Sequence, residues 1–132
     1  MYKSVPFALG MSLAAGLAFT SGARADGDAV EGAKVFKKCA ACHTATEMKN
    51  RVGPYLVGIV GRPVASIADY KYSKAMTAHA AEVPVWTEEA LTTYLHDPKS
   101  VVKGTKMTFP GLKKDEDVAN VIAYLKDPSA VK

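Results

Sequence analysis

Cysteine is scarce in this chain: 132 residues include only two, at positions 39 and 42. A network of several disulfides is therefore excluded, and so is the common structural zinc site, which draws on two separate cysteine pairs. The spacing Cys-x-x-Cys alone leaves open one disulfide or a thioredoxin-like redox pair. The sequence also lacks internal repeats, low-complexity segments and linkers, so we expect a single domain.

The excess of positive charge is small. The chain has 17 Lys and Arg residues against 13 Asp and Glu. Lys3 and Arg24 belong to the N-terminal segment described next, and without them the count is 15 against 13, a net charge of +2. An excess of this size does not predict nucleic-acid binding. No catalytic triad, nucleotide motif or recognisable pair of catalytic carboxylates is present in the sequence, so we do not expect an enzyme.

The N-terminal segment has the pattern of an export signal. Residues 4–23 are uncharged and largely apolar, Lys3 precedes them, and Ala23-Arg24-Ala25 follows. This order is typical of a cleavable secretory signal peptide. An uncleaved membrane anchor is the alternative, because about 20 apolar residues can span a bilayer, although one proline and three glycines make a poor long helix. We predict a signal peptide over 1–25 and a domain over 26–132, located in the periplasm.

Several short helices can be predicted from apolar spacing and caps. Helices are expected over residues 29–38, 74–81, 88–96 and 115–126. The expected N-caps are Asp28, Ser73 and Thr87, and Glu31 is expected to complete a capping box with Asp28. Glycine and proline mark residues 52–63 as a loop, with a short strand hairpin as the alternative, and residues 99–112 are expected to be irregular. No strand pattern stands out, so the predicted fold class is all-α, with short helices and long loops.

The residue after the second cysteine changes the interpretation of the pair. Cys39-Ala40-Ala41-Cys42-His43 is the signature of covalent haem attachment. Two cysteines separated by two residues on a helical turn reach the two vinyl groups of a haem, and the adjacent histidine points its imidazole at the iron. We therefore predict one haem c, thioether bonds at Cys39 and Cys42, and His43 as an axial ligand.

The second axial position has several candidates: Met48, Met76, His79, His96, Met107 or no residue at all. Met48 is too near His43 in the sequence to reach the opposite face easily. His79 and His96 are expected on the polar surface of their helices, and Met76 is expected to pack in the core. Met107 lies in a loop rich in glycine and proline, which can direct one side chain toward a metal, and is the favoured candidate.

A series of residues matches one known family in order: Gly32, Phe36, Cys39 to His43, Gly53-Pro54, Gly58, Gly61-Arg62, Trp86, Tyr94, Pro98, Gly104 to Met107, and Tyr124. With these motifs the chain resembles class I cytochromes c, in particular the bacterial cytochromes c2 and c550 that are related to mitochondrial cytochrome c. The resemblance extends from about Gly32 to Leu125. It departs from the mitochondrial pattern by one fewer residue between Phe36 and Cys39, and by a longer stretch before Trp86.

The resemblance implies a small cytochrome c fold wrapped around one covalently bound haem, and roles for particular residues. Met107 would bind the iron opposite His43, and the Pro54 carbonyl would accept a hydrogen bond from His43. Tyr94 would approach the Met107 sulfur. The residues implied at a haem propionate are Arg62, Tyr72 and Trp86. Close crossing of the first and last helices would be allowed by Gly32.

The expected function is that of a soluble, monomeric single-haem electron carrier. It would shuttle one electron between membrane-bound redox complexes, or from a periplasmic dehydrogenase to an oxidase or reductase. The resemblance places lysines around the exposed haem edge, and they would dock such partners: Lys37, Lys38, Lys99, Lys103, Lys106, Lys113 and Lys114. A small haem peroxidase or gas-binding haem protein is the alternative if Met107 is not a stable ligand.

Overall fold

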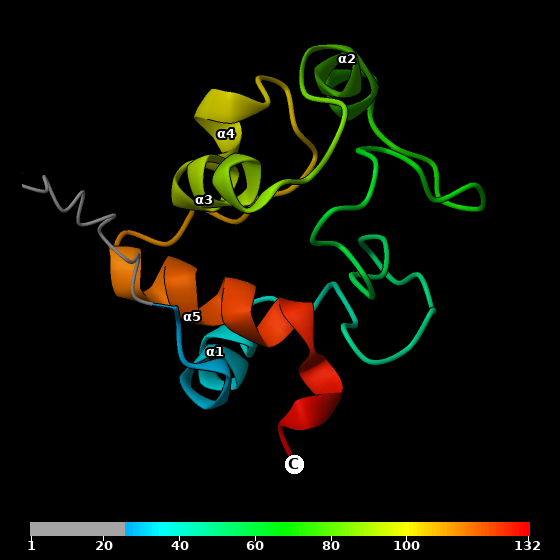
Figure 1. The fold of residues 1–132 in the computed structure, drawn as a ribbon. Coiled ribbons are helices and arrows are strands. Elements are labelled where there is room, and N and C mark those ends of the chain that lie inside the picture. The colour runs from blue at the N-terminus through cyan, green and yellow to red at the C-terminus, as the bar shows by residue number, and fades with distance from the viewer. Residues whose placement is uncertain (1–25) are drawn as a thin grey trace, which may run out of the picture.

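The computed structural model describes residues 26–132, and the predicted signal peptide over 1–25 lies outside them. The described helices are α1 (Ala29–Phe36), α2 (Lys74–Glu82), α3 (Glu88–His96), α4 (Pro98–Val101) and α5 (Asp115–Lys126), followed by the 3-10 turn η1 (Pro128–Ala130). Long loops join them (Figure 1). The expectation of an all-α fold is confirmed. Among the described residues no helix is long and apolar enough to span a membrane.

The helix boundaries agree with the sequence-based prediction at most ends and differ at two places. Ser73 and Thr87 cap α2 and α3 through hydrogen bonds from Met76 and Ala90 to their side chains, as expected. The first helix ends at Phe36, two residues early, because the chain there tightens into the turn that carries the cysteines. A one-turn helix, α4, lies inside the segment expected to be irregular. It forms because Asp97 caps it and Pro98, at its first position, has a backbone angle suited to helix.

The predicted strand alternative is absent from residues 26–132, where the only bridge pairs Pro63 with Val85. Two backbone hydrogen bonds form this bridge, from the Val64 N–H to the Pro84 carbonyl and from the Trp86 N–H to the Arg62 carbonyl, both at 2.9 Å. The loop that follows the cysteines is thereby held beside the segment before α3. This pairing brings Arg62 and Trp86 together from positions 24 residues apart.

The crossing of α1 and α5 is the main packing contact between helices (Figure 1). Gly32 lies at the crossing, where an added Cβ atom would be only 1.9 Å from the backbone oxygen of Asn120. Beside it the rings of Phe36 and Tyr124 pack with their centroids 5.2 Å apart. Glycine is thus required by the close approach of two backbones, as the resemblance implied.

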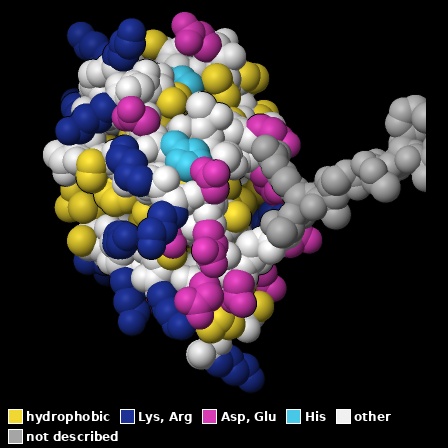
Figure 2. Space-filling view, turned by 90° about the vertical axis from the view of Figure 1, so that its left-hand side faces the viewer, with side chains coloured by type: hydrophobic (Ala, Val, Ile, Leu, Met, Phe, Trp, Pro, Cys, Tyr) yellow, Lys and Arg dark blue, Asp and Glu magenta, His cyan; other side chains and the backbone are white. Residues whose placement is uncertain are grey.

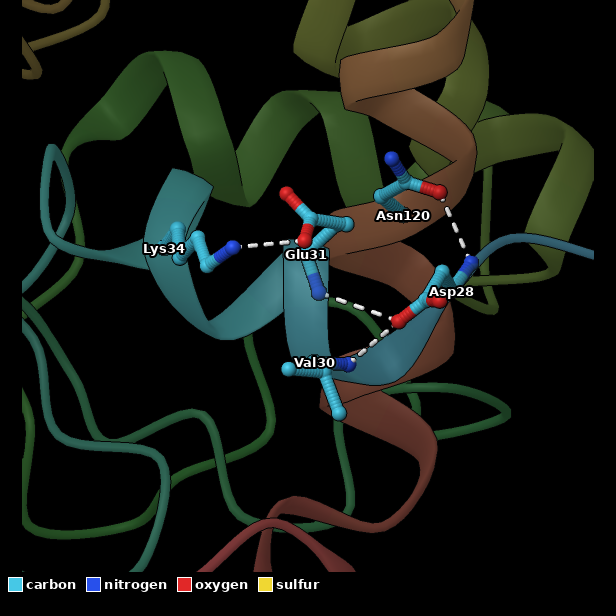
Figure 3. A network of polar contacts seen from close by, with 5 residues as sticks. All are labelled: Asp28, Val30, Glu31, Lys34 and Asn120. Carbon is cyan, nitrogen blue, oxygen red and sulfur yellow. Dashed lines mark hydrogen bonds and ion pairs between the residues drawn. The ribbon is translucent and has the colours of Figure 1, made fainter.

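A partly buried polar contact joins the start of α1 to the middle of α5, and it corrects the capping-box prediction. The Asp28 side chain accepts hydrogen bonds from Val30 and Glu31, as an N-cap should (Figure 3). The Asp28 backbone N–H, however, donates to Asn120 Oδ1 at 2.7 Å rather than to Glu31. Glu31 instead pairs with Lys34 at 2.6 Å. The reciprocal half of the box is therefore replaced by a contact with a residue 92 positions away.

Candidate functional site

The turn after α1 holds both cysteines on one helical turn. The Phe36 carbonyl accepts hydrogen bonds from Cys39 and Ala40, and the Cys39 carbonyl accepts from Cys42 and His43 at 3.1 and 3.0 Å. Both cysteines are half-buried and free rather than joined in a disulfide. Burial raises the pKa of the Cys39 thiol, with the charge of Lys38 opposing it. Redox-active pairs need a lowered thiol pKa, so this environment argues against a thioredoxin-like role.

His43 is held in the form that binds metals. Its Nδ1 lies 2.7 Å from the carbonyl oxygen of Pro54, the contact that the resemblance implied. A carbonyl can only accept, so Nδ1 carries the hydrogen and Nε2 keeps a free lone pair. Burial lowers the pKa of His43, and the charge of Arg62 lowers it further, while the Pro54 hydrogen bond opposes this. The neutral imidazole is therefore favoured, and it is the form that ligates a metal.

Gly53 lets the chain pass directly against the ring of His43. A Cβ atom at this position would lie 2.3 Å from Cε1 of His43. The Gly53 N–H donates to the Cys42 carbonyl at 2.9 Å, so the loop returns to the attachment turn at this point. The absence of a side chain at position 53 therefore allows Pro54 to reach the imidazole.

Met107 lies half-buried in the loop between α4 and α5, close to a buried tyrosine. The Tyr94 hydroxyl donates to Sδ of Met107 at 3.8 Å. The Met107 N–H donates to the Thr105 hydroxyl at 3.2 Å, which helps to shape the loop. Burial raises the pKa of Tyr94 to about 12, so its phenol remains neutral and able to donate near neutral pH. The contact between Tyr94 and Met107 is thus present as the resemblance implied.

The other candidate ligands are engaged elsewhere or exposed. Met48 is 74% exposed, and Met76 packs against the core. The expectation of surface histidines was wrong for His79, which is only 8% exposed. Its ring packs against that of Trp86, with the ring centroids 5.7 Å apart. It also failed for His96, which is half-buried with both ring nitrogens near oxygen acceptors. No sequence signal distinguished these positions, because their burial depends on how the chain after each helix folds back against it.

Arg62 presents an unpartnered polar atom inside the protein. Its Nη1 donates to the carbonyls of Tyr55 and Val57 at 3.0 and 3.1 Å. Its Nε is buried without a hydrogen-bond partner. Burial lowers the pKa of this guanidinium, with Tyr72 and Tyr55 opposing the shift. A half-buried cation with an unused donor is suited to an anionic group such as a carboxylate.

Trp86 and Tyr72 are the other two residues that the resemblance implied at a haem propionate, together with Arg62. Trp86 is 6% exposed, and its ring centroid lies 4.9 Å from that of Tyr94. The Tyr72 hydroxyl accepts a hydrogen bond from the Ile67 N–H at 3.2 Å, so its own hydrogen remains available to another acceptor. Two free thiols, a neutral imidazole, a thioether and a half-buried guanidinium with one unpartnered nitrogen together fit a haem with its propionates.

The lysines named as docking residues are all exposed. Six of them lie on or beside the loops that flank Cys39 or Met107, and Lys99 lies in α4. Lys113 also donates to the carbonyls of His96 and Pro110. Figure 2 shows Lys and Arg side chains gathered along one side of the face that it draws, with Asp and Glu gathered toward the other side. The surface charge is therefore unevenly distributed.

Comparisons with known proteins agree with this geometry. The family model described as Cytochrome c matches residues 29–128. Cytochrome c2 of Afifella marina is 48% identical over 96 residues, covering 72% of this chain and 77% of the relative. Cytochrome c-550 of Ancylobacter novellus is 47% identical over 97 residues, covering 73% and 91%. The solved structure of cytochrome cH from Methylobacterium extorquens has a TM-score of 0.69 and 44% identity, covering 76% of this chain and 98% of that one.

Proposed function

The chain belongs to the cytochrome c family and is a single-haem electron carrier with covalently bound haem c, and from this premise we propose which residues hold the haem. Cys39 and Cys42 would form the thioether bonds to the haem, and His43 and Met107 would ligate its iron. The observation that carries this proposal is the pairing of each ligand with its own support. His43 is oriented by Pro54 at 2.7 Å, and Met107 is approached by Tyr94 at 3.8 Å.

The haem, when bound, supplies an iron that accepts and releases one electron. The protein's residues make that exchange simple. The Pro54 carbonyl fixes the His43 tautomer, so Nε2 needs no proton transfer before it binds. Tyr94 stays neutral near neutral pH and donates to the Met107 sulfur. If both His43 and Met107 hold the iron, a substrate would find no free coordination position, which suits a carrier rather than an enzyme.

Arg62, Tyr72 and Trp86 are proposed to bind the haem propionates. The support is the buried Nε of Arg62, which lacks a partner, and the unused hydrogen of the Tyr72 hydroxyl. A propionate at Arg62 would supply the anion that a buried guanidinium needs. Trp86 would offer its indole N–H from a ring that Tyr94 and His79 hold in place.

Cytochromes c2 are electron carriers to redox complexes, and we propose that this chain meets such partners in the periplasm through its lysines. The exposed positions around Cys39 and Met107 would face an acidic surface on a membrane-bound complex or a periplasmic redox enzyme. Opposite charges steer such encounters and raise the association rate. A monomer without nucleic-acid partners is sufficient for this role.

The absorption spectrum of the oxidised protein tests the ligand assignment. We expect the weak far-red band of methionine-ligated ferric haem in the natural protein. Met107→Leu should abolish that band and give a high-spin spectrum, because leucine fills a similar volume without a sulfur. Met76→Leu is the matched control and should keep the band.

Two results would contradict the assignment. If Met76→Leu abolished the band and Met107→Leu kept it, the wrong methionine would have been chosen. A high-spin, five-coordinate spectrum of the natural protein would instead favour the alternative of a peroxidase or gas-binding protein.

A further inference from the structure

The loop over residues 102–112, here called the Met107 loop, is fastened at both ends to the segment that precedes it. At its start Val102 is 2% exposed, and its N–H donates to the Pro98 carbonyl at 2.9 Å. At its end Leu112 is also 2% exposed, and its N–H donates to the Leu95 carbonyl at 2.8 Å. The loop is thus closed against the last turn of α3.

His96, the last residue of α3, adds a second fastening at the same end. Its Nδ1 lies 2.9 Å from the Leu112 carbonyl, and its Nε2 lies 3.1 Å from Oδ1 of Asp115. Both partners accept hydrogen bonds, so the protonated ring, with a hydrogen on each nitrogen, satisfies both. One imidazole therefore links the end of α3, the end of the Met107 loop and the first residue of α5.

The backbone around His96 takes part in the same junction. The His96 carbonyl accepts a hydrogen bond from Nζ of Lys113 at 3.2 Å. Gly111 has a φ of +104°, and a Cβ atom there would lie 2.2 Å from the His96 oxygen. The backbone at Gly111 therefore packs directly against the His96 carbonyl at the end of α3. This tight packing leaves little room for either segment to shift.

The charged groups around His96 come from two elements. Asp115 of α5, whose side chain is 98% exposed, faces the ring, and Lys113, just after the Met107 loop, bonds to the His96 carbonyl. Asp97 follows it in the chain and is committed to Ser100, whose N–H and hydroxyl both donate to its carboxylate. None of these side chains belongs to the proposed axial ligands, so the role of His96 is separate from ligation itself.

We propose that His96 is a positioning residue, which fastens the C-terminal end of the Met107 loop and thereby keeps the Met107 sulfur at its coordinating position. This inference rests on the proposed ligation by Met107. A neutral thioether is easily exchanged for another ligand when the segment carrying it can move away. A loop held at residue 112 has fewer alternative positions, so displacement of Met107 costs more free energy.

Displacement of Met107 by imidazole, followed in the oxidised holoprotein through the far-red band, tests the proposal. His96→Ala loses both ring contacts and should lower the imidazole concentration at half displacement about tenfold. His96→Asn places an amide N–H near the position of Nδ1 and should restore the value to within about threefold of the natural protein. Thr93→Ala, an exposed change on the same helix, is the matched control and should have no effect.

Unfolding by guanidinium, measured on the same variants, separates positioning from general stability. A purely structural His96 would lower the unfolding midpoint and leave the imidazole concentration unchanged. Equal imidazole concentrations for the natural protein and His96→Ala would therefore overturn the proposal. If His96→Ala does not fold, His96→Leu, which keeps the bulk of the side chain but loses both ring contacts, takes its place, and an imidazole concentration equal to that of the natural protein would overturn the proposal.

Ligation by Met107 and the positioning role of His96 are distinguished by the far-red band of the natural protein. A natural protein without the far-red band would overturn the ligation by Met107, and the role of His96 with it. A natural protein with the band, whose displacement is insensitive to position 96, would overturn the role of His96 alone.

Discussion

Burial controls the protonation of His43, one proposed ligand, and of Tyr94, which contacts the other, Met107. The pKa of His43 is lowered chiefly because its ring is removed from water, and the pKa of Tyr94 is raised to about 12 for the same reason. Both shifts favour the neutral form. The imidazole then has a free lone pair for a metal, and the phenol keeps a hydrogen for the Met107 sulfur. One physical cause thus prepares both faces of the site.

The raised pKa of Tyr94 predicts a loss of stability at high pH. An unfolded tyrosine ionises at about pH 10, whereas Tyr94 in the folded protein ionises near 12. The unfolded state therefore gives up its proton first as pH rises. The contribution of the neutral Tyr94 to the free energy of unfolding is about 2 to 3 kcal/mol. It is complete below about pH 10 and is lost between about pH 10 and about pH 12.

Guanidinium unfolding at about pH 9 and about pH 11.5 checks this, with Tyr94→Phe as the comparison. Lysines also titrate in this range, so the quantity of interest is the difference between the two proteins. The natural protein should lose more stability than Tyr94→Phe. Parallel losses would show that Tyr94 ionises normally.

The crossing of α1 and α5 shows how single residues determine the relation of two elements. Gly32 allows the backbones to meet, and Asn120 reaches across to the N–H of Asp28 at 2.7 Å (Figure 3). The same contact explains why the expected capping box is incomplete. The Asp28 N–H donates to Asn120, whereas in a capping box it would donate to the Glu31 side chain. Tertiary packing here overrides a local motif.

Gly32→Ala should therefore destabilise the protein despite alanine's higher helix propensity. In an isolated helix the change would gain about 1 kcal/mol. In this crossing the new Cβ atom would lie 1.9 Å from the Asn120 oxygen, so we expect a net loss of about 3 kcal/mol. Thermal or denaturant unfolding measures it. Val30→Ala, on the exposed side of α1, is the control and should change stability by less than about 0.5 kcal/mol. A stabilised Gly32→Ala protein would mean that the helices cross less closely.

At the scale of the whole molecule the distribution of charge matters more than its sum. The net charge outside residues 1–25 is only +2, yet Lys and Arg gather along one side of the surface in Figure 2. An uneven distribution gives the protein a dipole that can orient it toward an acidic partner. The proposed docking lysines would act through this field rather than through the total charge.

Electron transfer to a membrane-bound oxidase should therefore slow as salt is added. Between about 0.01 M and about 0.15 M ionic strength the screening length falls from about 30 Å to about 8 Å. We expect the association rate to fall several-fold over this range. The double variant Lys103→Glu with Lys106→Glu should lower the rate at low salt about tenfold and reduce its salt dependence.

Lys132→Glu provides the matched control for this experiment. It changes an exposed lysine at the C-terminus, away from α4 and the segment that follows it (Figure 1). Its rate should remain near that of the natural protein at every salt concentration. Two results would contradict docking through the named lysines: electron-transfer rates that do not change with ionic strength, or a rate for Lys132→Glu as low as that of the double variant.

Much of the fold and of the candidate site could be predicted because the signals are local. Caps at Ser73 and Thr87 and the apolar spacing of α5 act within a few residues, and those helices form where expected. Cys39, Cys42 and His43 lie on one turn whose geometry follows from their spacing. The helix α4 was not predicted, because it is a single turn whose cap, Asp97, directly follows the preceding helix.

By itself the sequence determined the attachment motif, the succession of helices and a short set of ligand candidates, since each depends on neighbours along the chain. Only the tertiary structure decided that His79 is buried against Trp86, that Arg62 keeps an unused buried donor, and that His96 joins Leu112 to Asp115. These facts depend on how the chain packs in three dimensions. Their physical reason is that burial and hydrogen-bond partners are properties of the packed chain, and a residue's neighbours in sequence do not specify them.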